Sequence, residues 1–309
     1  APSPKPQAPS PKPQAPSPKP QAPSPKPNAV YTSLSSAAPT LPWEARWFLW
    51  DGGFLAVGVS TGTVPPHAHH AIQIAFGLDR DVALRVCEGG EWSEWLVARA
   101  ILVRPDGEHS FDGLGALTAM LFLDPETIEG RWLLAGNAEP MQPVAPARLE
   151  NALPLLRRIA DDPPDAQGVA LLIDQAVRAL CSGPRPSRHV DERVLRALEF
   201  IRSADAGSLS LDDVAAHVFL SPSRFQHLFK EQLGLPFRRY LLWRKLTRAL
   251  LAVGRGMSLS AAAHAAGFSD SAHFTRTCYQ MFGIPPSFLI GRGVHHEIPA
   301  PFELPLSAE

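Results

Sequence analysis

The sequence contains few cysteines and no long apolar run. The three cysteines, Cys87, Cys181 and Cys278, are far apart and form no C-x-x-C pair. This spacing excludes a disulfide framework and a cysteine zinc knuckle, so a reducing compartment is expected. No stretch approaches the roughly 20 apolar residues of a membrane helix, and the N-terminus is rich in Pro and Lys where a signal peptide would be apolar. We therefore expect a soluble, cytoplasmic protein with no membrane partner.

Net charge is almost absent, but the two halves of the chain differ in sign. The 309 residues, 45% of them hydrophobic, are enough for two domains of ordinary size. Residues 188–291 carry 13 basic and 8 acidic side chains, whereas residues 29–187 carry 11 and 19. A basic half beside an acidic one is expected when only one half faces a polyphosphate.

Most of the proline excess lies at the N-terminus. Residues 1–28 are four copies of Ala-Pro-Ser-Pro-Lys-Pro-Gln, with Asn28 in place of the last Gln. Proline fixes φ and lacks an amide proton, so neither a helix nor a ladder can form. We expect a disordered, semi-rigid polyproline-type spacer, with a Pro-rich ligand for a partner domain as the alternative.

The segment 29–145 has the pattern of a β domain. Short β-branched and aromatic runs are separated by turn residues such as Asp51-Gly52-Gly53, which is typical of an antiparallel barrel or sandwich. The expected strands cover residues 46–50, 54–60, 71–76, 82–87, 100–104 and 117–123.

Helical periodicity begins near residue 146. Apolar residues recur at helical spacing over 147–160 and 165–181, until Gly183-Pro184-Arg185-Pro186 breaks the pattern. These two helices could close off the barrel or pack against a second copy of themselves. We therefore assign 146–187 as a helical linker or dimerisation region.

Residues 188–291 are expected to form closely spaced helices that contain two helix-turn-helix units. In the first unit, Ser221 precedes Pro222 as an N-cap, and Gly234 is a left-handed cap candidate at the end of that helix. In the second, the turn contains Gly267 and Asp270 caps the final helix. The expected helices cover residues 190–203, 211–218, 222–232, 236–253, 261–266 and 271–282.

The helix over 236–253 joins the two units. About 17 residues give a length of roughly 25 Å, which with flanking turns can hold two recognition helices near the ~34 Å repeat of the major groove. Basic and polar side chains on or beside this connector would contact phosphates and fix the register on DNA. These phosphate-contact candidates are Ser221, Arg238, Arg239, Arg244 and Lys245.

The motifs of this module resemble the DNA-binding domain of the AraC/XylS family of bacterial transcription regulators. They are Leu-Ser-Leu-Asp-Asp-Val-Ala at 209–215, Leu-Ser-Pro-Ser-Arg-Phe at 220–225, Ala-Gly-Phe-Ser-Asp-Ser-Ala-His-Phe-Thr-Arg at 266–276 and Phe-Gly-Ile-Pro-Pro-Ser-Phe at 282–288. The resemblance implies binding to double-stranded promoter DNA as a homodimer, and contact with RNA polymerase if the protein is an activator. The implied DNA-binding residues are Ser223, Arg224, Gln226, His227, Lys230, Ser271, Ala272 and Arg276.

Two histidine motifs in the β domain resemble those of cupin barrels. They are His67-Ala68-His69-His70 with Gln73, and Pro105-Asp106-Gly107-Glu108-His109. Gln73 stands where metal-binding cupins have a carboxylate, and a neutral amide binds divalent metal less well, so we expect no metal and no cofactor. The family resemblance implies a small-molecule effector in this domain. The effector-pocket candidates are His67, His69, Gln73 and His109.

Together these patterns predict an α+β multidomain protein. A cupin-like β-barrel is followed by a helical linker, an all-α double helix-turn-helix domain and a C-terminal tail at 292–309. The predicted function is sequence-specific, effector-controlled transcription regulation without catalysis. Two alternatives remain: a cupin metalloenzyme with an appended DNA-binding domain, which needs a filled metal site, and an effector-independent regulator whose barrel serves only for dimerisation.

Overall fold

Two β-sheets form the N-terminal half of the structure. The computed structural model describes residues 43–185, 190–204, 209–287 and 293–302, so the Pro-rich repeat lies outside the described residues. The seven-stranded sheet has the order β11 (Met141–Pro143), β8 (Ala100–Val103), β4 (Ile72–Gly77), β10 (Leu117–Leu123), β2 (Gly53–Ser60), β1 (Trp43–Trp50) and β12 (Gly293–Glu297). The five-stranded sheet has the order β3 (Thr63–His67), β9 (Glu108–Asp112), β5 (Val82–Glu88) and β6 (Glu91–Trp92), with β7 (Leu96–Ala98) also on β5.

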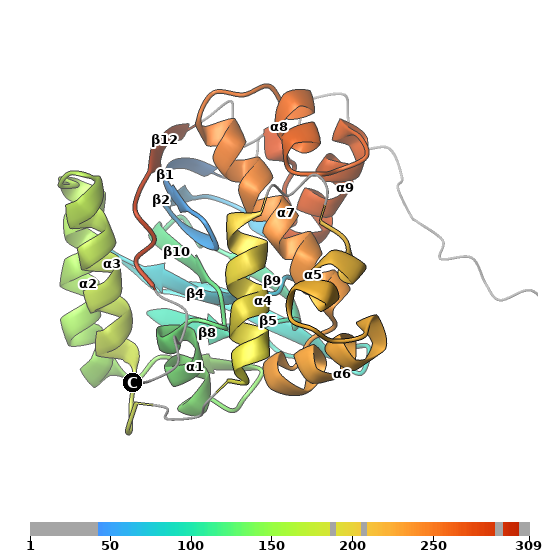
Figure 1. The fold of residues 1–309 in the computed structure, drawn as a ribbon. Helices are drawn as coiled ribbons and strands as arrows, with labels where there is room; N and C mark the ends of the chain where they lie inside the picture. The colour runs from blue at the N-terminus through green and yellow to red at the C-terminus, as the bar shows by residue number, and fades with distance from the viewer. Residues whose placement is uncertain (1–42, 186–189, 205–208, 288–292, 303–309) are drawn as a thin grey trace, which may run out of the picture. The chain divides into compact units, whose positions relative to one another are not determined.

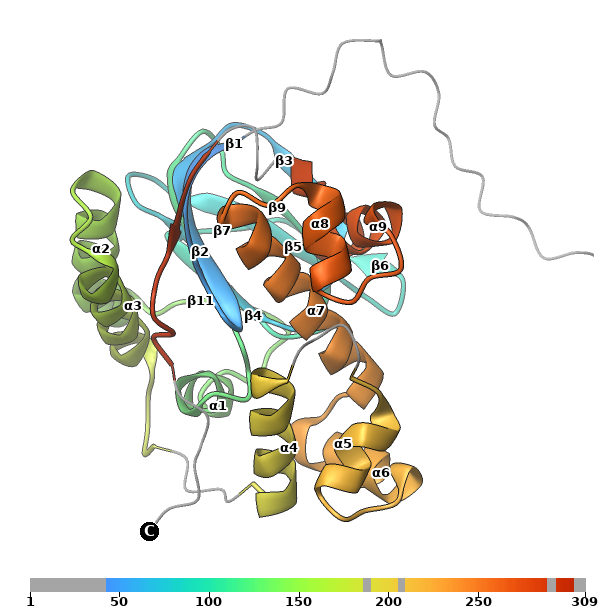
Figure 2. The same ribbon diagram turned by 45° about the horizontal axis from the view of Figure 1, so that its top comes forward.

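Both faces of the seven-stranded sheet are buried. Phe54 and Ala56 of β2 belong to the core shared with the five-stranded sheet, whereas Leu55 and Val57 belong to the core on the opposite face. The second core is completed by α2 (Pro146–Asp161) and α3 (Ala166–Leu180), which lie side by side along this sheet in Figures 1 and 2. The apolar faces of the predicted linker helices are therefore used to cover the barrel.

The helical module consists of α4 (Glu192–Ser203), α5 (Leu211–His217), α6 (Pro222–Leu233), α7 (Phe237–Gly254), α8 (Leu259–Ala265) and α9 (Ser271–Phe282). Side-chain N-caps begin most of these helices, and Ser210 forms a reciprocal capping box with Asp213 at α5. The predicted boundaries agree with the structure to within about two residues because these caps are local signals. Among the described residues, no helix combines the length and apolar character that crossing a membrane requires.

Helix α7 takes part in two different cores. Its first turns, with Phe237 and Tyr240, pack with α4, α5 and α6 in a core of their own. From Trp243 onward, α7 joins α8 and α9 in the core that also contains β-strand residues such as Phe54 and Phe122. Figure 2 shows α7 running from the α5–α6 pair to the α8–α9 pair. The second helix-turn-helix unit thus shares its core with the barrel, whereas the first does not.

Several elements were not predicted. Strand β3 contains Pro65 and Pro66, which the sheet tolerates because β3 is an edge strand with a register shift between Val64 and His67. Helix α1 (Ile128–Ala135), capped by Thr127, was also missed.

The C-terminal tail is corrected in part, because residues 293–297 form β12. This strand pairs in parallel with β1. Its partner strand lies some 250 residues away in sequence, so β12 could not be predicted from the local pattern of residues. Ile298 and Phe302, which follow the strand, are buried in the core between the seven-stranded sheet and helices α2 and α3.

Candidate nucleic-acid interface and histidine cluster

The first recognition helix, α6, presents a polar face to solvent. Ser221 accepts a hydrogen bond from the backbone N–H of Arg224, and Gly234 ends the helix in the left-handed conformation at φ +81°. Phe225 and Phe229 are fully buried and orient the helix. All five residues predicted to contact DNA from this helix are exposed: Ser223, Arg224, Gln226, His227 and Lys230.

The second recognition helix, α9, has the same local construction. Asp270 accepts from the N–H of His273 at 2.6 Å, and Gly283 ends the helix at φ +68°. Ala272 and Arg276 are exposed, and Ser271 is half-buried. His273 packs edge-on against Phe268. Among the described residues Arg276 has no ion-pair partner, so its guanidinium is free to bind a ligand outside the chain.

The two turns have the same hydrogen bonds but different residues. In the second unit Gly267 adopts φ +79° and donates to His264 O, and in the first Phe219 adopts φ +57° and donates to Ala216 O. A side chain in the left-handed region costs roughly 1–2 kcal/mol, partly offset by the chain entropy that glycine adds on unfolding. Phe219 is 88% exposed, so removing its ring loses almost no packing.

Phe219→Gly is therefore expected to raise the free energy of unfolding by about 0.5–1 kcal/mol. Urea unfolding monitored by far-UV circular dichroism measures this change. Phe219→Ala, which keeps a Cβ in the same backbone conformation, is the matched control and should give little or no gain. A loss of stability in the glycine variant would mean that the exposed ring packs in solution.

The structure corrects the phosphate-contact candidates. Arg244 is fully buried and cannot reach DNA. Lys245 is half-buried and donates to Gly267 O at 2.9 Å, while Arg239 pairs with Asp106 at 3.2 Å. Arg238 and Ser221 are exposed, although Ser221 also serves as the α6 N-cap. Arg238 is thus the member of this set whose charge is both accessible and unpaired among the described residues.

Arg244 belongs to a buried polar cluster that the sequence analysis did not identify. Its guanidinium lies 2.5 Å from Asp51 Oδ1 and 3.4 Å from Asp124 Oδ2. Asp124 Oδ1 accepts from the indole N–H of Trp243 at 2.5 Å, and Arg202 approaches Asp124 Oδ2 at 3.6 Å. Burial raises the pKa of Asp124 to about 6, with Glu126 adding to the effect and the arginines opposing it. One feature of the sequence could have indicated that Arg244 is buried. It lies four residues, about one helical turn, after the apolar Tyr240 and so on the same face of the helix.

A second buried pair adjoins this cluster. His70 Nε2 and Glu126 Oε1 lie 2.5 Å apart, and both side chains are almost completely buried. Burial opposes the charge of each partner, but Glu126 keeps the pKa of His70 above its usual value and His70 keeps that of Glu126 below. The two opposite shifts both favour the charged form of the pair.

The four effector-pocket candidates lie together inside the barrel. His67 and His109 are direct cross-strand partners on β3 and β9, and their ring centroids are 4.2 Å apart. His69 lies 5.0 Å from His109 between centroids. One ring nitrogen from each of the three histidines lies within 4.8 Å of the others. Gln73 of β4 completes the group, and all four side chains are at least 95% buried.

The hydrogen bonds of this histidine cluster (His67, His69, His109) leave acceptor atoms facing one another. His69 Nδ1 lies 3.0 Å from Ala71 O and His109 Nδ1 lies 2.8 Å from Gly107 O, so each Nδ1 carries a proton. Burial lowers the pKa of His69 to about 4 and that of His109 well below its usual value, so both rings are neutral. Each Nε2 is then an acceptor, yet both face Gln73 Oε1, at 2.9 and 3.0 Å.

Two arrangements resolve this conflict. In the first, the Gln73 amide is rotated by 180°, so that its NH₂ group donates to both histidines. The nitrogen and oxygen of a side-chain amide occupy nearly the same volume, and this flip therefore needs no other change in packing. Alternatively, a cation would collect the imidazole lone pairs and Gln73 Oε1, whose amide nitrogen has no partner among the described residues. Imidazole binds transition-metal ions at about 2.0–2.1 Å, so small side-chain shifts would close the cluster on an ion. The residues therefore fit a metal of the kind that cupin folds hold, despite the neutral Gln73.

The helical module is similar in sequence to known DNA-binding regulators. Residues 214–291 match the model of a helix-turn-helix domain family. The regulatory protein PocR of Salmonella typhimurium is 31% identical over 105 residues, which are 34% of each chain. The transcriptional activator RhrA of Rhizobium meliloti is 38% identical over 86 residues, 27% of each chain. The arabinose operon regulatory protein of Escherichia coli is 34% identical over 100 residues, 32% of this chain and 34% of the relative.

These matches span about a third of the length of the curated relatives. A solved structure extends the comparison to the barrel: apo ToxT from Vibrio cholerae, in a variant form, covers 79% of this chain and 99% of its own, with a TM-score of 0.54 and 10% identity. That likeness concerns the fold, and it agrees with the arrangement of a sheet domain followed by helix-turn-helix units. The helical module is thus similar in sequence to the matching parts of these regulators, and the fold of the chain, a sheet domain in front of the helix-turn-helix units, is similar to that of ToxT.

Proposed function

We propose that this protein is a sequence-specific DNA-binding transcription regulator controlled by a small ligand held in the barrel. The observation that carries the proposal is the pair of exposed polar helix faces on α6 and α9, held at the two ends of α7. With 18 residues, α7 has a length of about 27 Å, which suits contact with successive turns of the major groove.

The relatives support the same function. PocR, RhrA and the arabinose regulator are named as regulatory proteins, and each matches this chain over the helical module. A cytoplasmic homodimer on promoter DNA, with RNA polymerase as a partner if it activates, follows from that likeness.

Selection of bound duplexes from a random library, over a salt series, tests the proposal. The expected result is an enriched site with two short boxes about one helical turn apart. Binding that is sequence-blind at every salt concentration, with and without added transition-metal ion, would contradict it.

Arg276 and Arg238 provide a matched pair for the mechanism of binding. Arg276→Ala is expected to relax the preference at one base position by about 1–3 kcal/mol, because its guanidinium can make a bidentate contact with guanine. Arg238→Ala is expected to weaken binding on all sequences. It should also reduce the slope of the logarithm of the binding constant against the logarithm of salt concentration (the salt slope) by about 1. Both effects are measured by fluorescence anisotropy on the selected site and its single-base variants. Equal losses on all sequences for Arg276→Ala would assign that residue to phosphate contact.

The histidine cluster is the observation that favours a metalloenzyme instead. A catalytic metal keeps an open position for water or substrate. Here His69 packs edge-on against Phe122 at 5.0 Å between centroids, and Phe282 and Trp243 lie at 6.0 and 6.4 Å. Because these aromatic rings pack against His69, we infer a regulatory and not a catalytic use of the cluster.

A further inference from the structure

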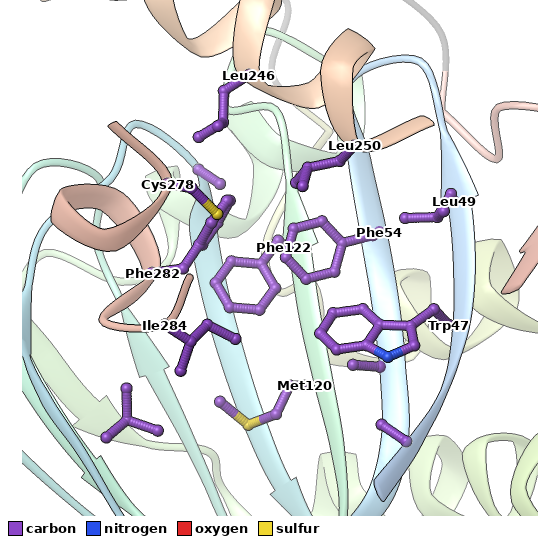
Figure 3. Packing of buried hydrophobic residues seen from close by; sticks show 14 of the residues in the cluster. Trp47, Leu49, Phe54, Met120, Phe122, Leu246, Leu250, Cys278, Phe282 and Ile284 are labelled. Atoms are coloured by element: carbon purple, nitrogen blue, oxygen red, sulfur yellow. The ribbon is translucent and has the colours of Figure 1, made fainter. Parts of the chain in front are cut away.

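A cavity of about 380 Å³ lies outside the core that joins the second recognition helix to the barrel. In that core, aromatic side chains fill the space: Figure 3 shows Phe282 of α9 approaching Phe54 and Phe122, which lie 5.3 and 5.5 Å from it between ring centroids. The cavity is formed instead by the residues just before α1, by α1 itself and by the last turn of α6. It is therefore separate from the histidine cluster.

The cavity lies where two hydrophobic cores meet. Leu134 of α1 packs against the core between the seven-stranded sheet and helices α2 and α3, whereas Leu233 of α6 packs against the core of the first helix-turn-helix unit. Both residues line the cavity, together with Pro125 and Ala135. The volume is within the range of small-molecule sites, and an apolar group placed there would have apolar contacts on both sides.

One wall of the cavity carries a buried carboxylate with an unpartnered oxygen. Glu126 is almost completely buried; its Oε1 lies 2.5 Å from His70 Nε2, but its Oε2 has no hydrogen-bond partner among the described residues. Burial opposes the negative charge, yet His70 keeps the pKa of Glu126 below its usual value. A buried charged oxygen without a hydrogen bond costs free energy, so a ligand that donates to Oε2 is favoured.

Two hydrogen-bond donors line the same cavity. Arg131 of α1 contributes a guanidinium group, and Gln232 of α6 contributes a side-chain amide. Gln232 Oε1 accepts from the backbone N–H of Asp191 at 3.1 Å, so the NH₂ group is the end of this amide that can donate to a ligand. Guanidinium and amide donors suit a carboxylate. The lining thus combines one negative and one positive side chain, which match a ligand that carries both charges.

We propose that this cavity binds an apolar α-amino acid. Glu126 Oε2 accepts a hydrogen bond from the ammonium group of the ligand, and Arg131 and Gln232 donate to its carboxylate. The apolar side chain of the ligand packs between Leu134 and Leu233. A simple amine or a simple carboxylate would match only one of the two charged side chains. The proposal does not rest on DNA binding, and it adds a site outside the barrel to the proposed function.

Isothermal titration calorimetry on the full chain, without DNA, tests the class of ligand. L-Leucine and L-phenylalanine are each expected to bind with one equivalent. The analogues 4-methylpentanoate, which is leucine without its ammonium group, and 3-methylbutan-1-amine, which is leucine without its carboxylate, should bind at least tenfold more weakly, because each loses a charge-assisted hydrogen bond. Glycine should also bind at least tenfold more weakly, because it lacks the apolar side chain. If neither apolar amino acid shows saturable binding at millimolar concentration, as when only water fills the cavity, the proposal is overturned.

Ala135→Trp tests the location of the site. Ala135 is exposed and lines the cavity, so a larger side chain can fill the space without replacing a core residue, and leucine binding should be lost. Ala166→Trp, at an exposed position of α3 that does not line the cavity, is the matched control and should bind leucine as the wild type does. Unchanged binding in Ala135→Trp would overturn the site.

Two further variants test the roles of the charged residues. Glu126→Gln, which keeps the size of the side chain, should bind leucine and 4-methylpentanoate with similar affinity, because the ammonium group has lost its partner. Arg131→Gln should likewise bind leucine and 3-methylbutan-1-amine with similar affinity. A merely structural role would weaken all ligands equally and keep the wild-type preference, and that result would overturn the assignment. If Glu126→Gln does not fold, the analogue series and Ala135→Trp still decide the proposal.

Discussion

Replacing Arg244 with Met is expected to lower the free energy of unfolding by about 3–5 kcal/mol. The buried guanidinium pairs with Asp51 and Asp124, and its loss leaves the Asp124 carboxylate in the interior with Arg202 at 3.6 Å as its remaining cation. An uncompensated buried charge costs more than the aliphatic part of Met recovers by packing.

The loss should depend on pH. Burial already raises the pKa of Asp124 to about 6, and removing Arg244, which lowers it, raises it further. A raised carboxyl pKa penalises the folded state at pH values above the unfolded pKa, so the penalty grows from about pH 4 upward. The destabilisation by Arg244→Met is therefore expected to be smaller at pH 5 than at pH 8, as urea unfolding at the two pH values measures.

Arg238→Met is the matched control, because Arg238 is exposed on the same helix. Its effect on stability should lie within about 0.5 kcal/mol. The opposite pattern, in which Arg244→Met leaves stability unchanged but reduces the salt slope of DNA binding, would restore Arg244 as a phosphate contact and contradict the structure.

Replacing Gly283 with Ala is expected to cost about 2–4 kcal/mol, of which about 1 is backbone strain and the rest steric overlap. Gly283 adopts φ +68°, and the new Cβ would lie 2.7 Å from Val64 Cγ1 and 2.9 Å from Pro65 O. Pro65 O is a backbone atom, so relief requires α9 or β3 to move.

Gly234 provides the control at the corresponding end of α6. It has a similar backbone conformation, φ +81°, but a Cβ added there would meet nothing within 4 Å. Gly234→Ala is therefore expected to cost only about 1 kcal/mol, the strain alone. Urea unfolding of the two variants measures the difference, which reports how closely α9 packs on the barrel. Equal losses would show that α9 and the barrel separate in solution.

Local chemistry explains which elements could be predicted. Helix α9 was expected at 271–282 and is found there, because Asp270 and Gly283 mark its two ends within the sequence itself. Strands of the seven-stranded sheet such as β2 and β10 were expected from their apolar runs. Strand β12 and the edge strand β3 were not, since the first depends on pairing with distant β1 and the second contains two prolines.

The candidate site divides in the same way. The histidine motifs identified His67, His69, Gln73 and His109, and the structure brings all four together. The expectation of no metal, which drew on the neutral amide of Gln73, stays a prediction. The structure places His69 and His109 against that amide, with His67 beside them. The charge of Arg244 indicated phosphate contact, whereas its position one helical turn after Tyr240 places it on the buried face of α7.

The helix-turn-helix units, their caps, the exposed polar faces of α6 and α9 and the histidine motifs could all be predicted, because each depends on residues within a few positions of one another. Three features depend on the packing of the folded chain: α9 shares a core with the barrel, Arg244 pairs with Asp51 and Asp124, and Gly283 contacts the histidine segment. These contacts join residues more than a hundred positions apart. They arise because both the barrel interior and the inner faces of α7 and α9 are apolar, and packing them together removes both surfaces from water.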